Sequence, residues 1–203
     1  PAGTVLTVAA VLGWCALAAF FRDPPRRPPA DPEQLVAPAD GRVVDIELIP
    51  DPEVTAWFNG GNAVRIGIFL SVLDVHLNRA PCDLTVRQRL YRQGVWHDAR
   101  DSRAATENEA MTLVAEGRGH WAGMPLAIRQ ISGAIARRIV CEAEPGAELS
   151  RSERYGMIKF GSRTELYLPA TACELMVKVG DRVLAGQTPI ARPVAGNRGD
   201  DRR

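Results

Sequence analysis

The sequence predicts a mainly β domain of the α+β class, preceded by an N-terminal apolar helix. Residues 3–21 (GTVLTVAAVLGWCALAAFF) form an almost unbroken apolar run. After about residue 33, short segments alternate apolar and polar residues and are separated by Gly, Pro, Asn and Asp. Such alternation is typical of strands with one buried face. A length of 203 residues is enough for one domain with a sizeable core plus an appendage.

The apolar run has the length of a membrane-anchoring helix. About 19 helical residues reach roughly 28 Å, close to the ~30 Å hydrocarbon core of a bilayer. The next segment, RDPPRRPP, holds three arginines and four prolines that stop the helix. We therefore expect an anchor over residues 1–22, a Pro/Arg-rich linker over 23–34 and the main domain over 35–203. The arginines favour the cytoplasmic face of the cell membrane for that domain.

Two alternatives for the apolar run remain. A cleaved signal peptide is disfavoured because the run is long and no small-x-small cleavage site precedes the prolines. The anchor can either cross the bilayer or lie in one leaflet, with Trp14 and Phe20-Phe21 near an interface.

The main domain is predicted to consist of short strands. Turns are expected at Asp40-Gly41 and at Asn59-Gly60-Gly61-Asn62. Residues 135–140 fit either a strand or a short helix, and residues 146–155 are expected to form a loop or a helical turn. The segments whose composition or alternation predicts strands are residues 42–48, 63–70, 84–91, 112–115, 125–131 and 166–168.

Two segments resemble a known β architecture. Residues 177–190 contain Val-x-x-Gly-Asp-x-Val-x-x-Gly, a pattern similar to that of the hammerhead-like domains of lipoyl and biotinyl carriers. Residues 37–44 resemble the start of the same barrel-sandwich hybrid. The resemblance implies a barrel-sandwich hybrid-like β domain, and it assigns no function by itself.

Charge and composition disfavour several classes of function. The net charge of +1 gives no reason to expect a nucleic-acid partner. Cys15, Cys82, Cys141 and Cys173 form no CxxC pair, so a disulfide framework is not expected and a reducing compartment fits best. The histidines His76, His97 and His120 are dispersed, which predicts no metal site. His97 and His120 are expected to be surface or packing residues.

Three residues together could form an activated nucleophile. The carbonyl of Gly161 is unshielded, and the hydroxyl of Ser162 follows directly. His76 lies at the exit of an apolar strand, and Asp40 lies in a turn. Each has an ordinary alternative: a turn at Gly161-Ser162, a turn-capping His76, and an Asp40 that bonds its own backbone. Jointly they supply a hydroxyl, a base and an orienting carboxylate.

The chain resembles the short, bacterial and archaeal type of phosphatidylserine decarboxylase. The matching pieces keep their order along nearly the whole chain. They are Phe20-Phe21-Arg22-Asp23-Pro24, Ala37-Pro38-Ala39-Asp40-Gly41, Asp74-Val75-His76-Leu77-Asn78-Arg79-Ala80-Pro81, Asn108-Glu109, and Phe160-Gly161-Ser162-Arg163 with Tyr167-Leu168-Pro169.

The resemblance implies a self-cleaving, pyruvoyl-dependent enzyme. Cleavage between Gly161 and Ser162 gives a β chain (1–161) and an α chain (162–203), which stay together as a heterodimer. Ser162 becomes the covalent pyruvoyl cofactor, which binds the amine of phosphatidylserine as a Schiff base and accepts electrons as CO₂ leaves. Phosphatidylethanolamine is the product, and the substrate lies in the membrane. A higher homo-oligomer stays open.

The resemblance also assigns residues. Asp40 matches the triad aspartate, and a neutral His76 oriented by Asp40 would activate Ser162. Two positions depart from the family pattern: Arg163 stands in place of Thr, and Arg79 in place of a second histidine. Whether His76 serves cleavage, decarboxylation or both stays open.

Other functions remain as alternatives. A membrane-tethered, non-enzymatic carrier or binding module is disfavoured because Lys178 lies inside the Val-rich pattern and not at a hairpin tip. A phosphocarrier would normally need a second histidine near His76. A decarboxylase of an ether-linked serine phospholipid has the same sequence signature.

Overall fold

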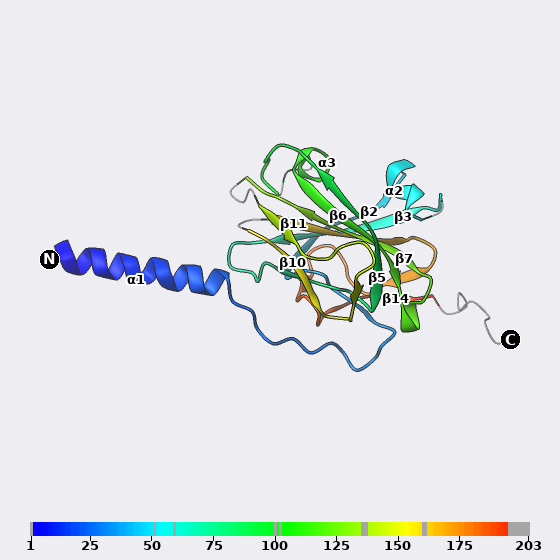
Figure 1. The fold of residues 1–203 in the computed structure, drawn as a ribbon, viewed down its shortest axis with the longest axis horizontal. Coiled ribbons are helices and arrows are strands. Elements are labelled where there is room, and N and C mark those ends of the chain that lie inside the picture. The colour runs from blue at the N-terminus through cyan, green and yellow to red at the C-terminus, as the bar shows by residue number, and fades with distance from the viewer. Residues whose placement is uncertain are drawn as a thin grey trace.

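An eight-stranded antiparallel sheet is the largest element of the protein, in a computed structural model that describes residues 2–50, 52–58, 60–99, 101, 103–134, 138–159 and 162–194. The sheet curls into a half-barrel (Figure 1). Its strands, in spatial order, are β13 (Arg182–Val183), β2 (Gly41–Ile49), β3 (Ala63–Leu70), β11 (Ser162–Pro169), β7 (Pro125–Ile131), β6 (Ala110–Gly117), β5 (Leu84–Arg92) and β9 (Glu148–Leu149).

Two three-stranded sheets complete the β structure of the described residues. One has the order β1 (Leu35–Val36), β14 (Pro189–Pro193) and β12 (Cys173–Leu175). The other has the order β4 (Leu77–Arg79), β10 (Arg154–Ile158) and β8 (Ile139–Cys141). The short helices are α2 (Pro52–Ala56), α3 (Ala104–Glu107) and the 3-10 turn η1 (Gly119–Trp121).

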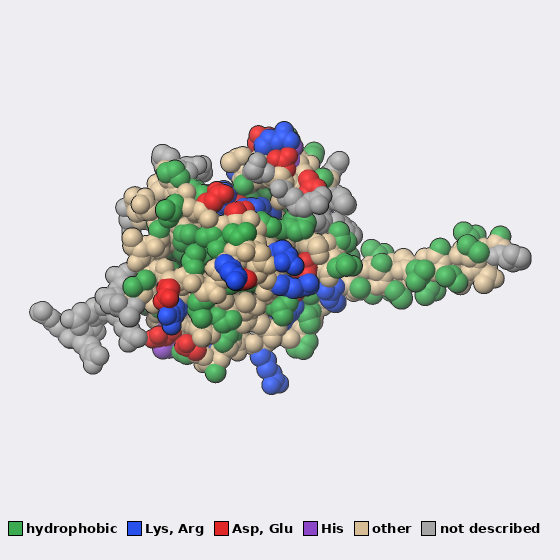
Figure 2. Space-filling model, turned by 180° about the vertical axis from the view of Figure 1, so that it is seen from behind, with side chains coloured by type: hydrophobic (Ala, Val, Ile, Leu, Met, Phe, Trp, Pro, Cys, Tyr) green, Lys and Arg blue, Asp and Glu red, His purple; other side chains and the backbone are tan. Residues whose placement is uncertain are grey.

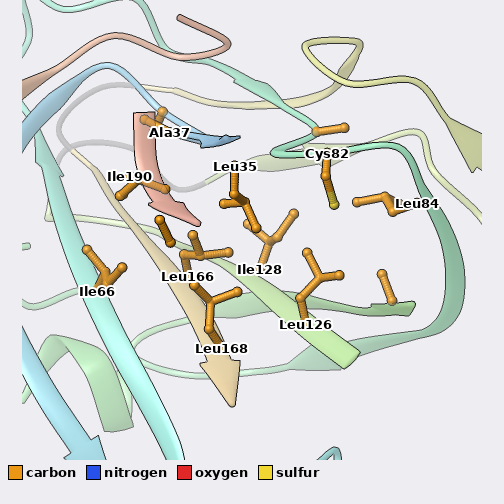
Figure 3. Close-up of a cluster of buried hydrophobic side chains, with 14 of the residues drawn as sticks. Leu35, Ala37, Ile66, Cys82, Leu84, Leu126, Ile128, Leu166, Leu168 and Ile190 are labelled. Carbon is orange, nitrogen blue, oxygen red and sulfur yellow. The ribbon is translucent and has the colours of Figure 1, made fainter. Parts of the chain in front are cut away.

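The core lies between the inner face of the large sheet and the small sheets. Side chains along β11 point alternately to the two faces of the sheet, so Leu166 and Leu168 lie in this core. They belong to the same cluster as Ile128 of β7 and Leu35 of β1 (Figure 3). Ser162 and Thr164 share the inner face with them because side chains two residues apart point the same way. Arg163, Glu165 and Tyr167 lie on the outer face.

The helix α1 (Ala2–Phe20) projects from the β body as a single rod (Figure 1). It is uncharged, has a mean hydropathy of 2.0 and is almost entirely exposed, so it is long and apolar enough to cross a membrane. Phe20 is the exception, because only 3% of it is exposed. The helix is therefore a candidate membrane anchor whose last turn enters the body.

The segment that follows α1 lies along the body and is fastened to it by arginines. The Arg151 side chain donates hydrogen bonds to the carbonyls of Pro29, Asp31 and Gln34. Asp23 forms ion pairs with Arg79 and Arg154. Residues 23–34, predicted as a linker, thus have fixed contacts with the domain.

The expectation of a mainly β domain behind an apolar helix is confirmed, and most predicted strands are present. The predicted ranges 63–70 and 125–131 coincide with β3 and β7. The prediction for 146–155 is partly wrong, because Glu148–Leu149 pairs with β5 as strand β9 and Arg154 begins β10. Residues 139–140 belong to strand β8, while 135–137 lie outside the described residues.

Candidate active site

His76 is fully buried between β3 and β4, and its ring has one partner and one free nitrogen. Nδ1 lies 2.9 Å from the carbonyl oxygen of Asp74, so Nδ1 carries the proton and donates it to that acceptor. Nε2 is buried and has no hydrogen-bond partner. Burial lowers the pKa of His76. The hydrogen bond to the Asp74 carbonyl and the negative charge of the Asp74 side chain act in the opposite direction but do not outweigh burial. The neutral ring therefore presents an Nε2 lone pair inside the protein.

Ser162 is the first residue of β11 and is also fully buried. It pairs with Leu70, the last residue of β3, and its Oγ has no hydrogen-bond partner. An unpartnered buried hydroxyl costs free energy, so its presence here needs a physical explanation. Gly161, the predicted partner of Ser162 in cleavage, lies outside the described residues.

A chain of buried amides connects the elements that carry His76 and Ser162. Asn78 of β4 donates from Nδ2 to Thr164 Oγ1 of β11 at 3.0 Å. Gln130 of β7 donates from Nε2 to Asn78 Oδ1 at 2.9 Å. His76 lies two residues before Asn78, and Ser162 lies two residues before Thr164. Each of the two unpartnered groups thus belongs to a residue two positions before one partner of this polar contact.

Backbone contacts hold the same neighbourhood together. The amide of Ile158 donates to the carbonyl of His76 at 3.2 Å, and β10, which ends at Ile158, pairs with β4. The chain therefore leaves β10 beside His76 and enters β11 at Ser162. Ile158, which contacts the backbone of His76, lies only four residues before Ser162 in the sequence.

Asp40 is buried in the turn before β2, and other groups occupy its carboxylate. Oδ1 accepts a hydrogen bond from the amide of Ala185 at 2.7 Å, and Oδ2 pairs with Arg26 at 2.7 Å. Burial raises the pKa of Asp40, although Ala185 and Arg26 oppose the shift. Among the described residues, no hydrogen bond joins Asp40 to His76, whose orienting partner is the Asp74 carbonyl. The catalytic role of Asp40 stays a prediction.

The next residue explains the sharp turn at Asp40. Gly41 has a φ of 150°, and a side chain there would collide with the carbonyl oxygen of Phe69 on β3. A residue without a Cβ is therefore required for β2 to start beside β3. This close approach fixes the Asp40 turn at the same end of the sheet as Ser162.

The last turn of α1 closes the site on one side. The rings of Phe20 and His76 are 4.3 Å apart between centroids. Lys159 Nζ lies 5.9 Å from the ring centroid of Phe21. The membrane-anchor candidate thus contacts the histidine directly, which the sequence did not predict.

The two residues that depart from the expected family pattern have structural partners. Arg79 donates to the carbonyl of Ser152 and to Asp23, so it fastens the segment after α1. Arg163 lies on the outer face of β11, where it bonds Asp45 and Glu165. Burial alone would lower the pKa of Arg163, but Asp45 and Glu165 outweigh burial and raise that pKa. Arg163 therefore anchors the start of β11 from the face opposite to Ser162.

The remaining candidates lie away from this site. His97 pairs with Glu107, and His120 is exposed. The four cysteines are free, and burial raises the pKa of Cys173 to about 12. No group of three His, Cys, Asp or Glu side chains suited to a metal ion occurs in the part of the chain that the structure describes.

Sequence reasoning missed the residues that support His76 and Ser162. Asp74 lies in the motif around His76, but it acts through its backbone carbonyl, which has no residue-type signature. Gln130 resembles any polar residue of a strand. Phe20 looked like an interfacial aromatic residue, and only the fold shows that it packs on His76.

Comparisons with known proteins agree on one family. The family model described as phosphatidylserine decarboxylase matches residues 16–191. A phosphatidylserine decarboxylase proenzyme of Pelobacter propionicus is 45% identical over 85% of this chain and 74% of the relative. The proenzyme of Trichlorobacter lovleyi is 47% identical over the same shares, and that of Neisseria gonorrhoeae is 40% identical over 89% of this chain and 67% of the relative. The chain belongs to the phosphatidylserine decarboxylase family.

Proposed function

We propose that this protein decarboxylates phosphatidylserine to phosphatidylethanolamine and CO₂, using a pyruvoyl group that it makes from Ser162. The observation that carries the proposal is the pair of buried, unpartnered atoms Ser162 Oγ and His76 Nε2. Their residues each lie two positions before one partner of the Asn78–Thr164 contact, which connects the two segments. A hydroxyl and a neutral imidazole are the nucleophile and base of acyl-transfer chemistry.

Self-cleavage then follows from the chemistry of these groups. Ser162 Oγ attacks the carbonyl carbon of Gly161, while His76 Nε2 takes the hydroxyl proton. The Gly161–Ser162 C–N bond breaks, the Ser162 nitrogen is protonated, and an ester joins Gly161 to Ser162 Oγ. Loss of the Ser162 Cα proton expels the Gly161 carboxylate and leaves dehydroalanine. Water replaces its nitrogen, which departs as ammonia, and a pyruvoyl group remains.

The surroundings of Ser162 fit a group attached at this position. Ser162 is buried, its hydroxyl has no partner to lose, and β11 is held between β3 and β7 along its length. The α chain (162–203) would therefore remain in the sheet after cleavage, giving a heterodimer with the β chain (1–161). When present, the pyruvoyl group supplies a carbonyl that accepts the electrons released as CO₂ leaves.

His76 has a second task in this scheme. Its Nδ1–H stays on the Asp74 carbonyl, which keeps the ring orientation and leaves Nε2 free to exchange protons. A proton held at Nε2 can be returned to the substrate carbon that has lost its carboxylate. The same atom thus serves cleavage first and turnover later.

The apolar helix suits a substrate that stays in a bilayer. A diacyl lipid leaves the membrane reluctantly, at about 0.8 kcal/mol per CH₂ group. Because the last turn of α1 contacts His76, an anchored helix would hold the site at the membrane surface. Arg22, Arg26 and Arg27 after the helix favour the cytoplasmic face.

Replacement of Ser162 tests the proposal. We expect the full chain to appear as two fragments on a denaturing gel and to release labelled CO₂ from carboxyl-labelled phosphatidylserine in vesicles. Ser162→Ala should give one uncut chain without activity. Ser152→Ala is a matched control, since Ser152 is also buried with an unpartnered Oγ; it should be cut and active. An uncut wild-type chain with full activity, or a cut Ser162→Ala chain, would refute the scheme.

A further inference from the structure

We propose that the turn Ser71–Asp74, here called the docking turn, inserts its apolar tip into the bilayer interface beside the end of α1. The occupant of this surface is the headgroup region of a membrane containing anionic phosphatidylserine. The inference rests on the proposed function for its substrate, but its physical test does not require turnover.

The tip of the docking turn is apolar and open to solvent. Leu73 is 82% exposed, the highest value among the large apolar side chains of the described residues, and Val72 is about half exposed. A single exposed apolar side chain is ordinary, but a valine and a leucine together at the tip of a turn next to an apolar helix form a directed apolar surface.

Hydrogen bonds hold this tip in place. Asp74 Oδ2 accepts bonds from the amide and the hydroxyl of Ser71, at 2.9 and 2.7 Å, and the amide of Asp74 donates to the carbonyl of Ser71. Arg182 pairs with the other carboxylate oxygen of Asp74 at 2.9 Å. The turn therefore presents Val72 and Leu73 in a fixed conformation, which lowers the entropy cost of insertion.

One side chain sets the depth of the turn relative to the helix. The guanidinium of Arg22 donates to the carbonyl of Ala19 in the last turn of α1 at 2.7 Å, and to the carbonyl of Leu73 at 2.6 Å. If α1 fills the hydrocarbon core, its last turn lies at the interface. Leu73 then lies at that same level.

The charges around the turn are complementary to an anionic membrane. Arg42, Arg182 and Asp74 line a hollow of about 430 Å³ beside Ser71, and because Asp74 is paired with Arg182, the charge of Arg42 leaves the hollow net positive. Basic side chains also gather on the body close to the base of the helix (Figure 2). Basic residues near a membrane surface are attracted to anionic lipids, each by roughly 1 kcal/mol.

The docking turn is also connected to the site. The side chain of Asp74 fixes the turn, while the carbonyl of the same residue fixes the His76 ring. Insertion of the tip would therefore place His76 at a set distance from the lipid headgroups. The turn thus acts as a positioning element for a membrane-bound substrate.

A fluorescent probe at the tip tests the insertion directly. An environment-sensitive dye is attached to Leu73→Cys in a Cys15→Ser, Cys141→Ser background, because Cys82 and Cys173 are buried. With phosphatidylcholine–phosphatidylserine vesicles, its emission should shift to shorter wavelength and be quenched by nitroxide-labelled lipids. The control, Leu48→Cys, lies on β2 at the end opposite to Arg42 and should show neither effect. A probe at residue 73 that stays in water would overturn the proposal.

Kinetics with two substrates give the functional readout. Leu73→Asp should lower the ratio of the rate on vesicles to the rate on short-chain, monomeric phosphatidylserine by about tenfold, as expected for a charge replacing a lipid-buried aliphatic side chain. Leu48→Asp, also an exposed apolar position, should leave the ratio unchanged. An unchanged ratio in Leu73→Asp would contradict a positioning role. If no variant releases CO₂, the proposed function fails while the dye result still decides insertion.

Discussion

The contact between Asn78 and Thr164 offers a sharp test of how the site is supported. Thr164→Val keeps the side-chain shape but removes the Oγ1 that accepts the Asn78 Nδ2–H at 3.0 Å. Both residues are fully buried, so the donor is left without water. We expect the free energy of unfolding to fall by about 1–3 kcal/mol. Because β11 also carries Ser162, we expect self-cleavage to slow by about 10–100-fold.

A matched variant separates site geometry from stability. Thr112→Val removes the hydroxyl that accepts Arg129 Nε, also at 3.0 Å, on the outer face of the sheet. Urea unfolding in detergent, in a Ser162→Ala background that stays uncut, gives the stability of each variant. The time course of fragment appearance on gels gives the cleavage rate. Equal slowing of cleavage in both variants, or an unchanged stability of Thr164→Val, would show that the Asn78–Thr164 bond does not support the site.

Three further predictions concern His76 and Asp40. His76→Gln should slow cleavage and abolish CO₂ release, since the Nε2 lone pair is lost; normal turnover would remove His76 from the mechanism. Burial holds the pKa of His76 below its ordinary 6.5, so the cleavage rate should be flat above pH 6.5 and decline only below it. A cleavage rate that changes with an inflection above pH 6.5, measured in a pH series, would contradict a lowered His76 pKa. Because the unfolded chain binds the proton more readily than the folded protein, His76 also lowers the free energy of unfolding as pH falls below 6.5. Asp40→Asn removes the charge paired with Arg26 and should slow cleavage with the fold retained by circular dichroism, whereas an unchanged rate would exclude Asp40.

The strands that could be predicted most accurately are apolar segments bounded by turn residues or proline. Ranges 63–70 and 125–131 coincide with β3 and β7, since turn residues or a proline mark their ends. The strand predicted over residues 166–168 is too short, because β11 begins at Ser162. Arg163 and Glu165 of this strand are charged and buried, and Arg163 bonds both Glu165 and Asp45.

The residue types of the site could be predicted, but not all of their partners. His76 Nε2 and Ser162 Oγ are both buried without a hydrogen-bond partner, and the catalytic roles of the two residues stay predictions. The expected orienting carboxylate of Asp40 instead faces Arg26, from a segment expected to be a linker. A backbone carbonyl, that of Asp74, orients the ring, and any residue type could supply it. Long-range pairing of this kind depends on the fold and leaves no local pattern.

The intact mass of the purified protein distinguishes pyruvoyl-forming self-cleavage from every other kind of processing. We expect two chains that divide at Gly161-Ser162, the smaller one blocked to amine reagents. Their masses should sum to that of the uncut chain plus one water and minus one ammonia, the balance of pyruvoyl formation. A sum that exceeds the mass of the uncut chain by one whole water, with a free serine amine on the smaller chain, would show simple proteolysis. That result would exclude pyruvoyl formation.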